Sequence, residues 1–173
     1  MRGSSIVLAC LLSLVVTPDL FAQSRPADPL ALVVSSDPLE LARMVDRLGD
    51  DAVLARLGAM GVATGTLDPA IVIAALRACP WLHAPEEALP RLAEIAAGHD
   101  PDLAPAAMVA IVRIADGLTR DGLDAREASD DPIRAALAPL EAIASDESAR
   151  HDLRVASARV SVLLRELVGS ASS

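Results

Sequence analysis

From residue 37 on, four Asp-Pro pairs divide the sequence at nearly equal intervals. They lie at Asp37-Pro38, Asp68-Pro69, Asp100-Pro101 and Asp131-Pro132, so that successive pairs are about 31 residues apart. An Asp side chain accepts hydrogen bonds from the unpaired N–H groups of a helix's first turn, and Pro at the first helical position gives up only an N–H that has no partner there. Each pair therefore predicts the start of a helix, and the regular spacing indicates a repeat.

Apolar residues recur three or four positions apart in the segments between these pairs, which is the spacing of one helix face. The longest such stripe lies near the C-terminus and consists of Leu153, Ala156, Val160, Leu163 and Leu167. No segment shows a convincing alternation of β-branched residues that is typical of a strand. The sequence therefore predicts an all-α fold, without a good helix over residues 117–130.

The core of this fold has to be built almost without aromatic residues. Hydrophobic residues make up 53 % of the chain but aromatic residues only 1 %, and Phe21 and Trp81 are the two that occur. Ala, Leu, Val and Ile must therefore fill the interior, and runs rich in Ala and Leu favour closely packed helices. A β-sandwich is disfavoured because its strands are normally rich in aromatic residues.

Two stretches of the chain share one order of residues: a helix with an early proline, an Asp turn and a second helix. The residues are Leu89-Pro90-x-Leu92-x-x-Ile95 with Asp100-Pro101-Asp102-Leu103, and Leu137-Ala138-Pro139-Leu140-x-x-Ile143 with Asp146 and Leu153-Arg154. This order resembles that of HEAT repeats. The resemblance covers residues 37–168 and implies a short α-solenoid of about three helical hairpins, the first of which pairs 38–58 with 69–79. An irregular helical bundle with similar helix starts is the alternative.

The N-terminus has the order of a secretory signal peptide. Met1-Arg2 is a short basic start, the apolar run Ile6–Val16 follows, and Ala22 is a small residue before a predicted cleavage site. The run is shorter than the roughly 20 residues that span a bilayer, so the sequence predicts no membrane-spanning helix. We therefore expect a signal peptide over 1–22, a linker over 23–36, a helical-repeat domain over 37–168 and a flexible tail over 169–173.

Two further features concern the destination of the chain. All 15 basic residues are Arg, and together with the abundance of Ala this is typical of a GC-rich bacterial genome, so we expect a periplasmic or extracellular protein. Cys10 follows Val7-Leu8-Ala9 and offers a lipoprotein cleavage site as the minor alternative. If Cys10 leaves with the signal peptide, Cys79 is the only thiol and we expect it to be a small buried hydrophobic residue.

The net charge of the chain and its lack of known catalytic motifs disfavour several classes of function. A net charge of −9 disfavours nucleic-acid partners, because that binding depends on basic side chains that neutralise phosphates. No Gly-rich phosphate loop, Ser-His-Asp signature, HExxH or CxxC motif occurs, so the sequence predicts neither a cofactor nor an enzyme.

The candidate partner-binding residues are Trp81, Arg150, Arg154 and Arg165. Trp81 lies in a connection between helices, where it either fills the seam between two hairpins or contacts a partner. The three arginines, with Ser161, are expected on one solvated face around the last helix, where a carboxylate of a partner could dock.

Two His-Asp pairs support an alternative function. His99-Asp100 and His151-Asp152 occupy equivalent turns of their predicted hairpins, and a metal-dependent all-helical hydrolase uses His and Asp ligands of this kind. The simpler interpretation is that these are turn residues, with Asp100 as a helix cap and Asp152 stabilising a helix N-terminus. The sequence therefore favours an exported, non-catalytic helical-repeat protein that binds or scaffolds another protein, of unknown identity, in the cell envelope.

Overall fold

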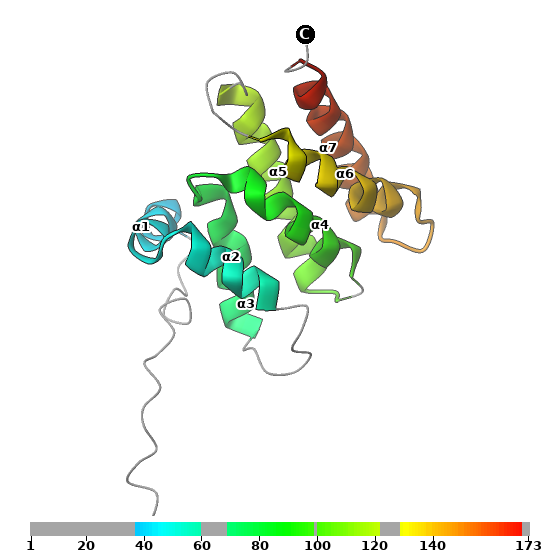
Figure 1. Cartoon of the computed structure of the whole chain (residues 1–173). Coiled ribbons are helices and arrows are strands. Elements are labelled where there is room, and N and C mark those ends of the chain that lie inside the picture. Colours follow the sequence, from blue (N-terminus) through cyan, green and yellow to red (C-terminus); the bar gives the residue numbers. More distant parts are fainter. Residues whose placement is uncertain (1–36, 60–68, 99, 122–128, 171–173) are drawn as a thin grey trace, which may run out of the picture.

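The computed structural model describes residues 37–59, 69–98, 100–121 and 129–170 (Figure 1). In these ranges the chain forms α-helices, two short 3-10 helices and no strand, which confirms the predicted all-α fold. The helices are α1 (Pro38–Leu48), α2 (Asp50–Ala59), α3 (Pro69–Ala78), η2 (Cys79–Trp81), η3 (Pro85–Ala88), α4 (Leu89–Ala97), α5 (Leu103–Asp121), α6 (Asp130–Ser145) and α7 (His151–Ser170). The predicted signal peptide and linker lie outside the described residues.

The first two Asp-Pro pairs begin helices at their prolines. Asp37 caps α1, because its Oδ1 accepts a hydrogen bond from the N–H of Leu39 at 3.0 Å, and Pro38 is the first helical residue. Pro69 likewise begins α3, while Asp68 lies outside the described residues. The N-terminal preferences of Asp and Pro thus set these helix starts.

The last two pairs begin helices with a shift. Asp100 Oδ1 accepts hydrogen bonds from the N–H groups of Asp102 (2.9 Å) and Leu103 (3.0 Å), so that α5 begins after one further turn. The cap of α6 is Ser129 and not the predicted Asp131: Ser129 Oγ accepts a hydrogen bond from the N–H of Asp131 at 3.2 Å. Ser is as good a cap as Asp, and the residue nearest the helix start takes the role.

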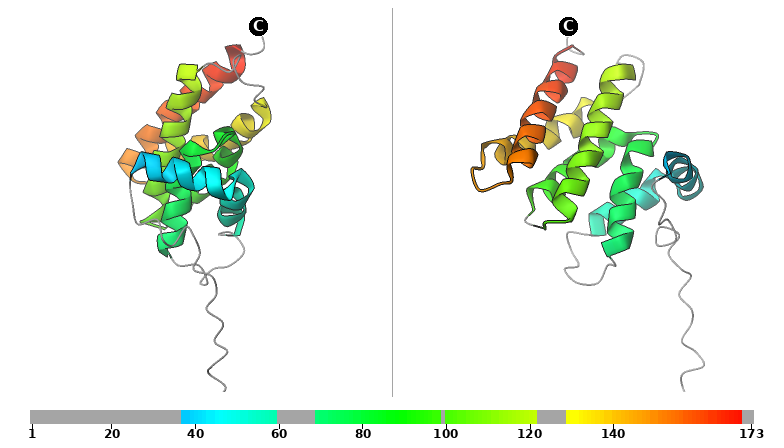
Figure 2. Two further views of the ribbon diagram at one scale, coloured as in Figure 1. Left: turned by 90° about the vertical axis from the view of Figure 1, so that its left-hand side faces the viewer. Right: turned by 180° about the vertical axis from the view of Figure 1, so that it is seen from behind.

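The helices form two layers (Figures 1 and 2). Along the chain, α2 packs on α3, α4 on α5, and α6 on α7. Within one layer α4 contacts α2 and α6, and within the other α5 contacts α3 and α7; the view from behind shows α3, α5 and α7 side by side. The pairs α4–α5 and α6–α7 correspond to two of the predicted hairpins, whereas HEAT-repeat membership stays a prediction.

The core between the layers is aliphatic, as the composition predicts. Its largest fully buried side chains are Leu41, Leu57, Leu76, Leu89, Leu92, Ile111, Ile114, Leu118, Ile133, Leu140 and Leu164. Alanines fill the positions between them, which lets helix backbones approach closely. None of the helices in the described ranges is both long and apolar enough to cross a membrane.

The two longest helices differ from the sequence-based prediction. α5 continues to Asp121, into residues 117–130 where the sequence predicts no good helix, because Leu118 is buried and extends the apolar face by one more turn. In α7 the predicted Leu153 and Leu167 are buried, but between them the buried leucine is Leu164, and the predicted Leu163 is half-buried. α7 also ends at Ser170, so that the first two residues of the segment predicted as a tail are helical.

Candidate functional site

Trp81 is the last residue of η2, and 37 % of its surface is exposed. The residue that enters the core at this point is the neighbouring Leu82, which is 5 % exposed. An aromatic ring that is partly exposed is able to contact a partner. The role of Trp81 in binding stays a prediction.

Cys79, two residues before Trp81, is fully buried, as the sequence predicts. Its thiol donates a hydrogen bond to the carbonyl oxygen of Ala75 at 3.1 Å. Burial raises the pKa of the Cys79 thiol to about 12, so the thiol stays protonated at neutral pH. Cys79 therefore acts as a small core residue.

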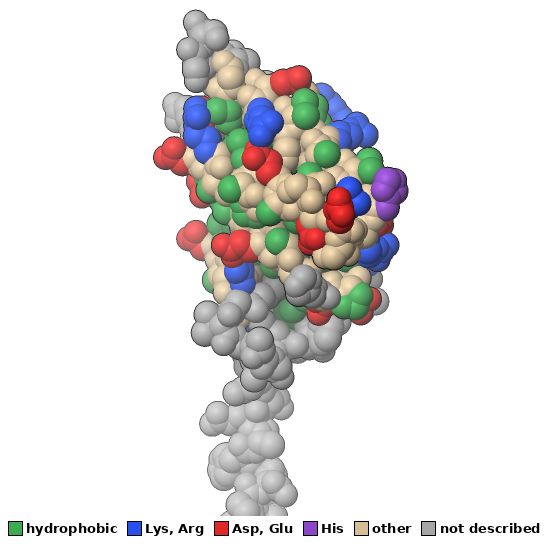
Figure 3. All heavy atoms as spheres, turned by 90° about the vertical axis from the view of Figure 1, so that its right-hand side faces the viewer, with side chains coloured by type: hydrophobic (Ala, Val, Ile, Leu, Met, Phe, Trp, Pro, Cys, Tyr) green, Lys and Arg blue, Asp and Glu red, His purple; other side chains and the backbone are tan. Residues whose placement is uncertain are grey.

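Two of the three candidate arginines are paired with carboxylates. Arg150 binds Asp152 through two hydrogen bonds, from Nε to Oδ1 (3.1 Å) and from Nη2 to Oδ2 (2.8 Å). Arg165 Nη2 donates to Glu141 Oε1 on α6 at 2.6 Å. On the face of the molecule that α6 and α7 form, arginine side chains lie among acidic and apolar ones (Figure 3). These pairs are exposed and contribute little to stability.

The third arginine corrects the predicted solvated face. Arg154 is half-buried, and its Nε is buried without a hydrogen-bond partner among the described residues. Ser161, expected on the same face, is 4 % exposed and points into the protein interior. The sequence pattern was misleading here because Ser, although polar, is small enough to be buried where two helices meet closely.

The two His-Asp pairs show the structural roles of their Asp residues. Asp100 caps α5, and Asp152 lies in the first turn of α7, where the hydrogen bond from Arg150 lowers the pKa of its carboxyl group. His151 is exposed, and His99 lies outside the described residues. Within the described ranges, no group of three His, Cys, Asp or Glu side chains is placed to hold a metal ion. The metal-dependent alternative stays an untested prediction.

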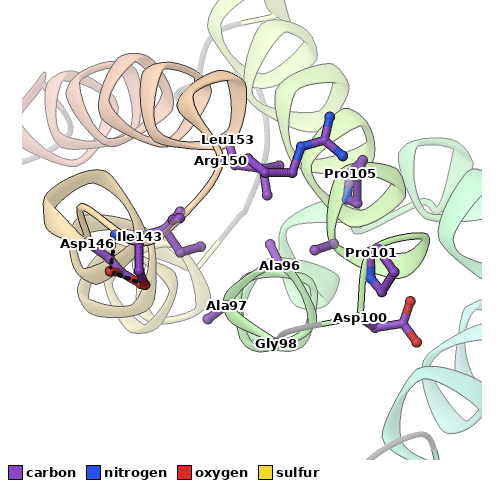
Figure 4. Close-up of a pocket in the computed structure, with 13 residues that line it drawn as sticks. Ala96, Ala97, Gly98, Asp100, Pro101, Pro105, Ile143, Asp146, Arg150 and Leu153 are labelled. Carbon is purple, nitrogen blue, oxygen red and sulfur yellow. Dashed lines mark hydrogen bonds between the residues drawn. The ribbon is translucent and has the colours of Figure 1, made fainter.

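A cleft of about 210 Å³ lies between the α4–α5 turn and the α6–α7 turn (Figure 4). Arg150 extends from the start of α7 toward Pro105 on α5, and the Asp100 carboxylate points away from the cleft. On the opposite side Asp146 accepts hydrogen bonds from the N–H and the hydroxyl of Ser148 at 2.8 and 2.7 Å. The polar groups at the cleft thus mainly form hydrogen bonds within the turns in which they lie.

A second concave region, which we call the α5–α7 groove, lies between these two helices and consists of two adjoining hollows of about 330 and 380 Å³. The two hollows share Val112, Asp152 and Ala156. Most of their walls are apolar, formed by Pro105, Met108, Val109, Val112, Leu153, Val155 and Ala156. Val109 and Val155 are 53 % and 55 % exposed, so the groove presents apolar surface to solvent.

None of the four candidate partner-binding residues lines this groove, although His151 and Asp152 do and the sequence holds a signal for it. Met108-Val109-Ala110-Ile111-Val112 is a continuous apolar run, and a helix that buries only one face needs no such run. Val109 therefore faces outward while Met108 and Ile111 face the core. An apolar residue on the polar side of an amphipathic helix was the available indication.

A polar contact far from the groove was also missed. The Asp50 carboxylate accepts hydrogen bonds from the backbone N–H groups of His83 (3.0 Å) and Ala84 (3.1 Å), and its Oδ1 lies 3.1 Å from His83 Nδ1. Gly49, with φ of 79°, makes the tight turn between α1 and α2 that positions Asp50. Burial acts to raise the pKa of Asp50, but these hydrogen bonds outweigh it and lower the pKa. The hydrogen bond to Asp50 raises the pKa of His83.

Three buried polar atoms have no hydrogen-bond partner among the described residues: Glu86 Oε2, Arg154 Nε and Ser161 Oγ. Glu86 lies on η3, and the other two residues lie on α7. None of the three residues lines the cleft or the α5–α7 groove.

Comparison with known protein families, with curated proteins and with solved structures found no match to this chain. The functional conclusion therefore depends on the sequence and on the geometry of the groove.

Proposed function

We propose that this chain is an exported, non-catalytic helical-repeat protein of the HEAT-like α-solenoid type, which binds a segment of another protein in the cell envelope. The observation that carries the proposal is the α5–α7 groove, where two apolar hollows lie next to each other between neighbouring helices. Contiguous exposed apolar surface of this kind marks interaction sites in soluble proteins.

Two further features support the proposal. Residues 1–22 have the order of a signal peptide, which fits export. The pairing of α2 with α3, α4 with α5 and α6 with α7 fits stacked hairpins, in which each pair completes the core of its neighbour. Such stacking leaves one side of α3, α5 and α7, the second helix of each pair, open to a partner.

Site-specific photo-crosslinking tests the proposal in cells that export the full-length chain. A photoreactive amino acid replaces Val109 or Val155 in the groove, and Ala138, an exposed residue of α6, in the control. We expect an adduct of one defined mass from both groove positions and none from position 138. Adducts from all three positions alike, or from none, would contradict a partner site in the groove.

A further inference from the structure

We infer that the α5–α7 groove binds an acidic amphipathic helix of a partner protein, an inference that rests on the proposed function and specifies the chemistry of the partner.

The shape of the groove suits a helix. Its two hollows share Val112 and Ala156, so that they lie next to each other between two neighbouring helices. An amphipathic helix places apolar side chains three or four positions apart, which is the spacing needed to fill two adjoining hollows. Met108, 3 % exposed, closes the floor of the first hollow, and Val109 and Val155 offer the exposed surface that such a helix would bury.

Two basic side chains at the groove have no carboxylate partner within the described chain. Arg113 on α5 lines the first hollow and Arg159 on α7 lines the second. Both side chains are exposed, and neither has a hydrogen bond or an ion pair among the described residues. The acidic residue of the groove, Asp152, is neutralised by Arg150.

Some other exposed arginines of the described chain have carboxylate partners, whereas Arg43, Arg47 and Arg120 have none among the described residues. Arg134 pairs with Asp130 at 3.4 Å, and Arg165 pairs with Glu141 at 2.6 Å. The groove therefore presents two uncompensated positive charges on a chain whose net charge is −9. Complementary charge steers association and selects partners, so these arginines favour carboxylates on both flanks of the bound helix.

The same charges disfavour two other occupants. A two-fold dimer through the groove would bring the Arg113 and Arg159 side chains of both copies to one interface, where like charges repel. The chain's own apolar segment before α1, residues 23–36, carries one Arg and one Asp and so has no net charge to offer. A separate acidic helix fits the groove better than either.

Peptide binding to the purified full-length protein tests this inference. The probe is a fluorescein-labelled peptide of about 18 residues, or five helical turns, with Leu and Ala on one face and Glu on both flanks; a matched peptide has Lys in place of Glu. We expect the acidic peptide to bind at least about tenfold more tightly at low salt, and its advantage to shrink at high salt because ions screen exposed charges. Equal affinities, or no binding of either peptide, would overturn the inference.

Two matched pairs of variants locate the binding. Val155→Asn removes an apolar wall and should weaken the acidic peptide about tenfold, whereas Val162→Asn, an equally exposed valine of α7 outside the hollows, should leave its affinity within about twofold. Replacing both Arg113 and Arg159 by Glu should reverse the preference toward the Lys peptide, and Arg43→Glu on α1 should not change it. Binding that is the same in all these variants would contradict the assignment.

Failure of this inference can be separated from failure of the proposed function. If the acidic peptide does not bind but photo-crosslinks form at positions 109 and 155, the groove binds a partner of different chemistry and only the inference is wrong. If neither occurs, both are wrong. If the two peptides bind equally well, and only after deletion of residues 23–36, the groove is assigned to the chain's own segment and the inference is overturned.

Discussion

The two sides of α7 are built differently. Toward the core, Val160 and Leu164 are fully or almost fully buried, and Ser157 is 0 % exposed with its Oγ 4.0 Å from Met108 Sδ on α5. Toward the outside, Val155 is mainly exposed and Arg159 has no ion-pair partner among the described residues. One helix thus has a closed side that holds the fold together and an open side that forms one wall of the groove.

The size of the residues and their position on α7 explain why one side of the helix stabilises the fold and the other side is open for binding. Ser157 is small, so α5 and α7 approach closely on the inner side and leave no space for a ligand there. The outer side carries β-branched valines, Val155 and Val162, that are more than half exposed within the described chain. Stability should therefore depend on the closed side, and binding on the open side.

The largest effect is expected from a cavity on the closed side. Leu164→Ala should lower the free energy of unfolding by about 2–5 kcal/mol, because the side chain is fully buried and the surrounding helices relax only partly. Urea denaturation followed by circular dichroism measures the change.

Leu163→Ala is the matched control, since Leu163 is the adjacent, half-buried leucine of the same helix. It should cost clearly less than Leu164→Ala. The reverse order would mean that α7 is rotated, and the two sides would exchange roles.

This pair also shows how far the sequence could predict the fold. The helix starts at Asp37 and Asp100 and the all-α class follow from local hydrogen bonding and apolar spacing. The inward residue of α7 does not, because Leu163 and Leu164 fit a helical stripe equally well. Burial of Ser157 and Ser161 decides between them, and that depends on how closely the neighbouring helices approach.

The candidate site was less predictable. Arg150 and Arg165 were assigned to partner binding from their sequence positions, but each bonds a carboxylate of its own chain. Arg113 and Arg159 have the same chemistry and no such partner among the described residues, a difference that appears only in three dimensions. The run around Val109 could have indicated the groove, whereas its second wall required the placement of α7.

A second substitution tests the comparison between the two sides of α7 by placing a larger side chain on the closed side. Ser157→Leu should destabilise the protein by about 1–3 kcal/mol, because the larger side chain has no space next to Met108. Thermal or urea denaturation measures the loss. Ala158→Leu, at the adjacent exposed position, should change stability by less than about 0.5 kcal/mol; similar losses in both variants would contradict a closed inner side.

The Asp50–His83 contact provides a polar reference outside both sides of α7. Asp50→Asn should lower stability by on the order of 1 kcal/mol near neutral pH, because the carboxylate accepts hydrogen bonds from two backbone N–H groups. The wild-type contribution of Asp50, whose pKa is lowered, is present above its ordinary value of 3.8 and is lost as the pH falls through the lowered pKa.

The contribution of His83, whose pKa is raised, has the opposite sign. It is fully present below the ordinary pKa of 6.5 and is lost as the pH rises through the raised pKa. His83→Gln should therefore flatten the fall in stability as the pH rises above 6.5. A wild-type profile that does not change in this range would argue against the contact.

The smallest effect is expected at the exposed pair on the outer surface of α6 and α7. Arg165→Ala should change the free energy of unfolding by no more than about 0.5 kcal/mol, because both side chains are exposed and screened by solvent. It should leave binding of the acidic peptide unchanged as well, since Arg165 does not line the groove. A strong loss of binding would return this arginine to the partner site that the sequence first indicated.

Hydrogen–deuterium exchange with and without the acidic helical peptide tests the central claim most directly, namely that the open side of α7 and the facing side of α5 form the binding surface. Binding should slow exchange in α5 around Val109 to Arg113 and in α7 around Asp152 to Arg159, while exchange around Trp81 stays the same. Protection confined to the region of Trp81, or spread evenly over all helices, would contradict the account.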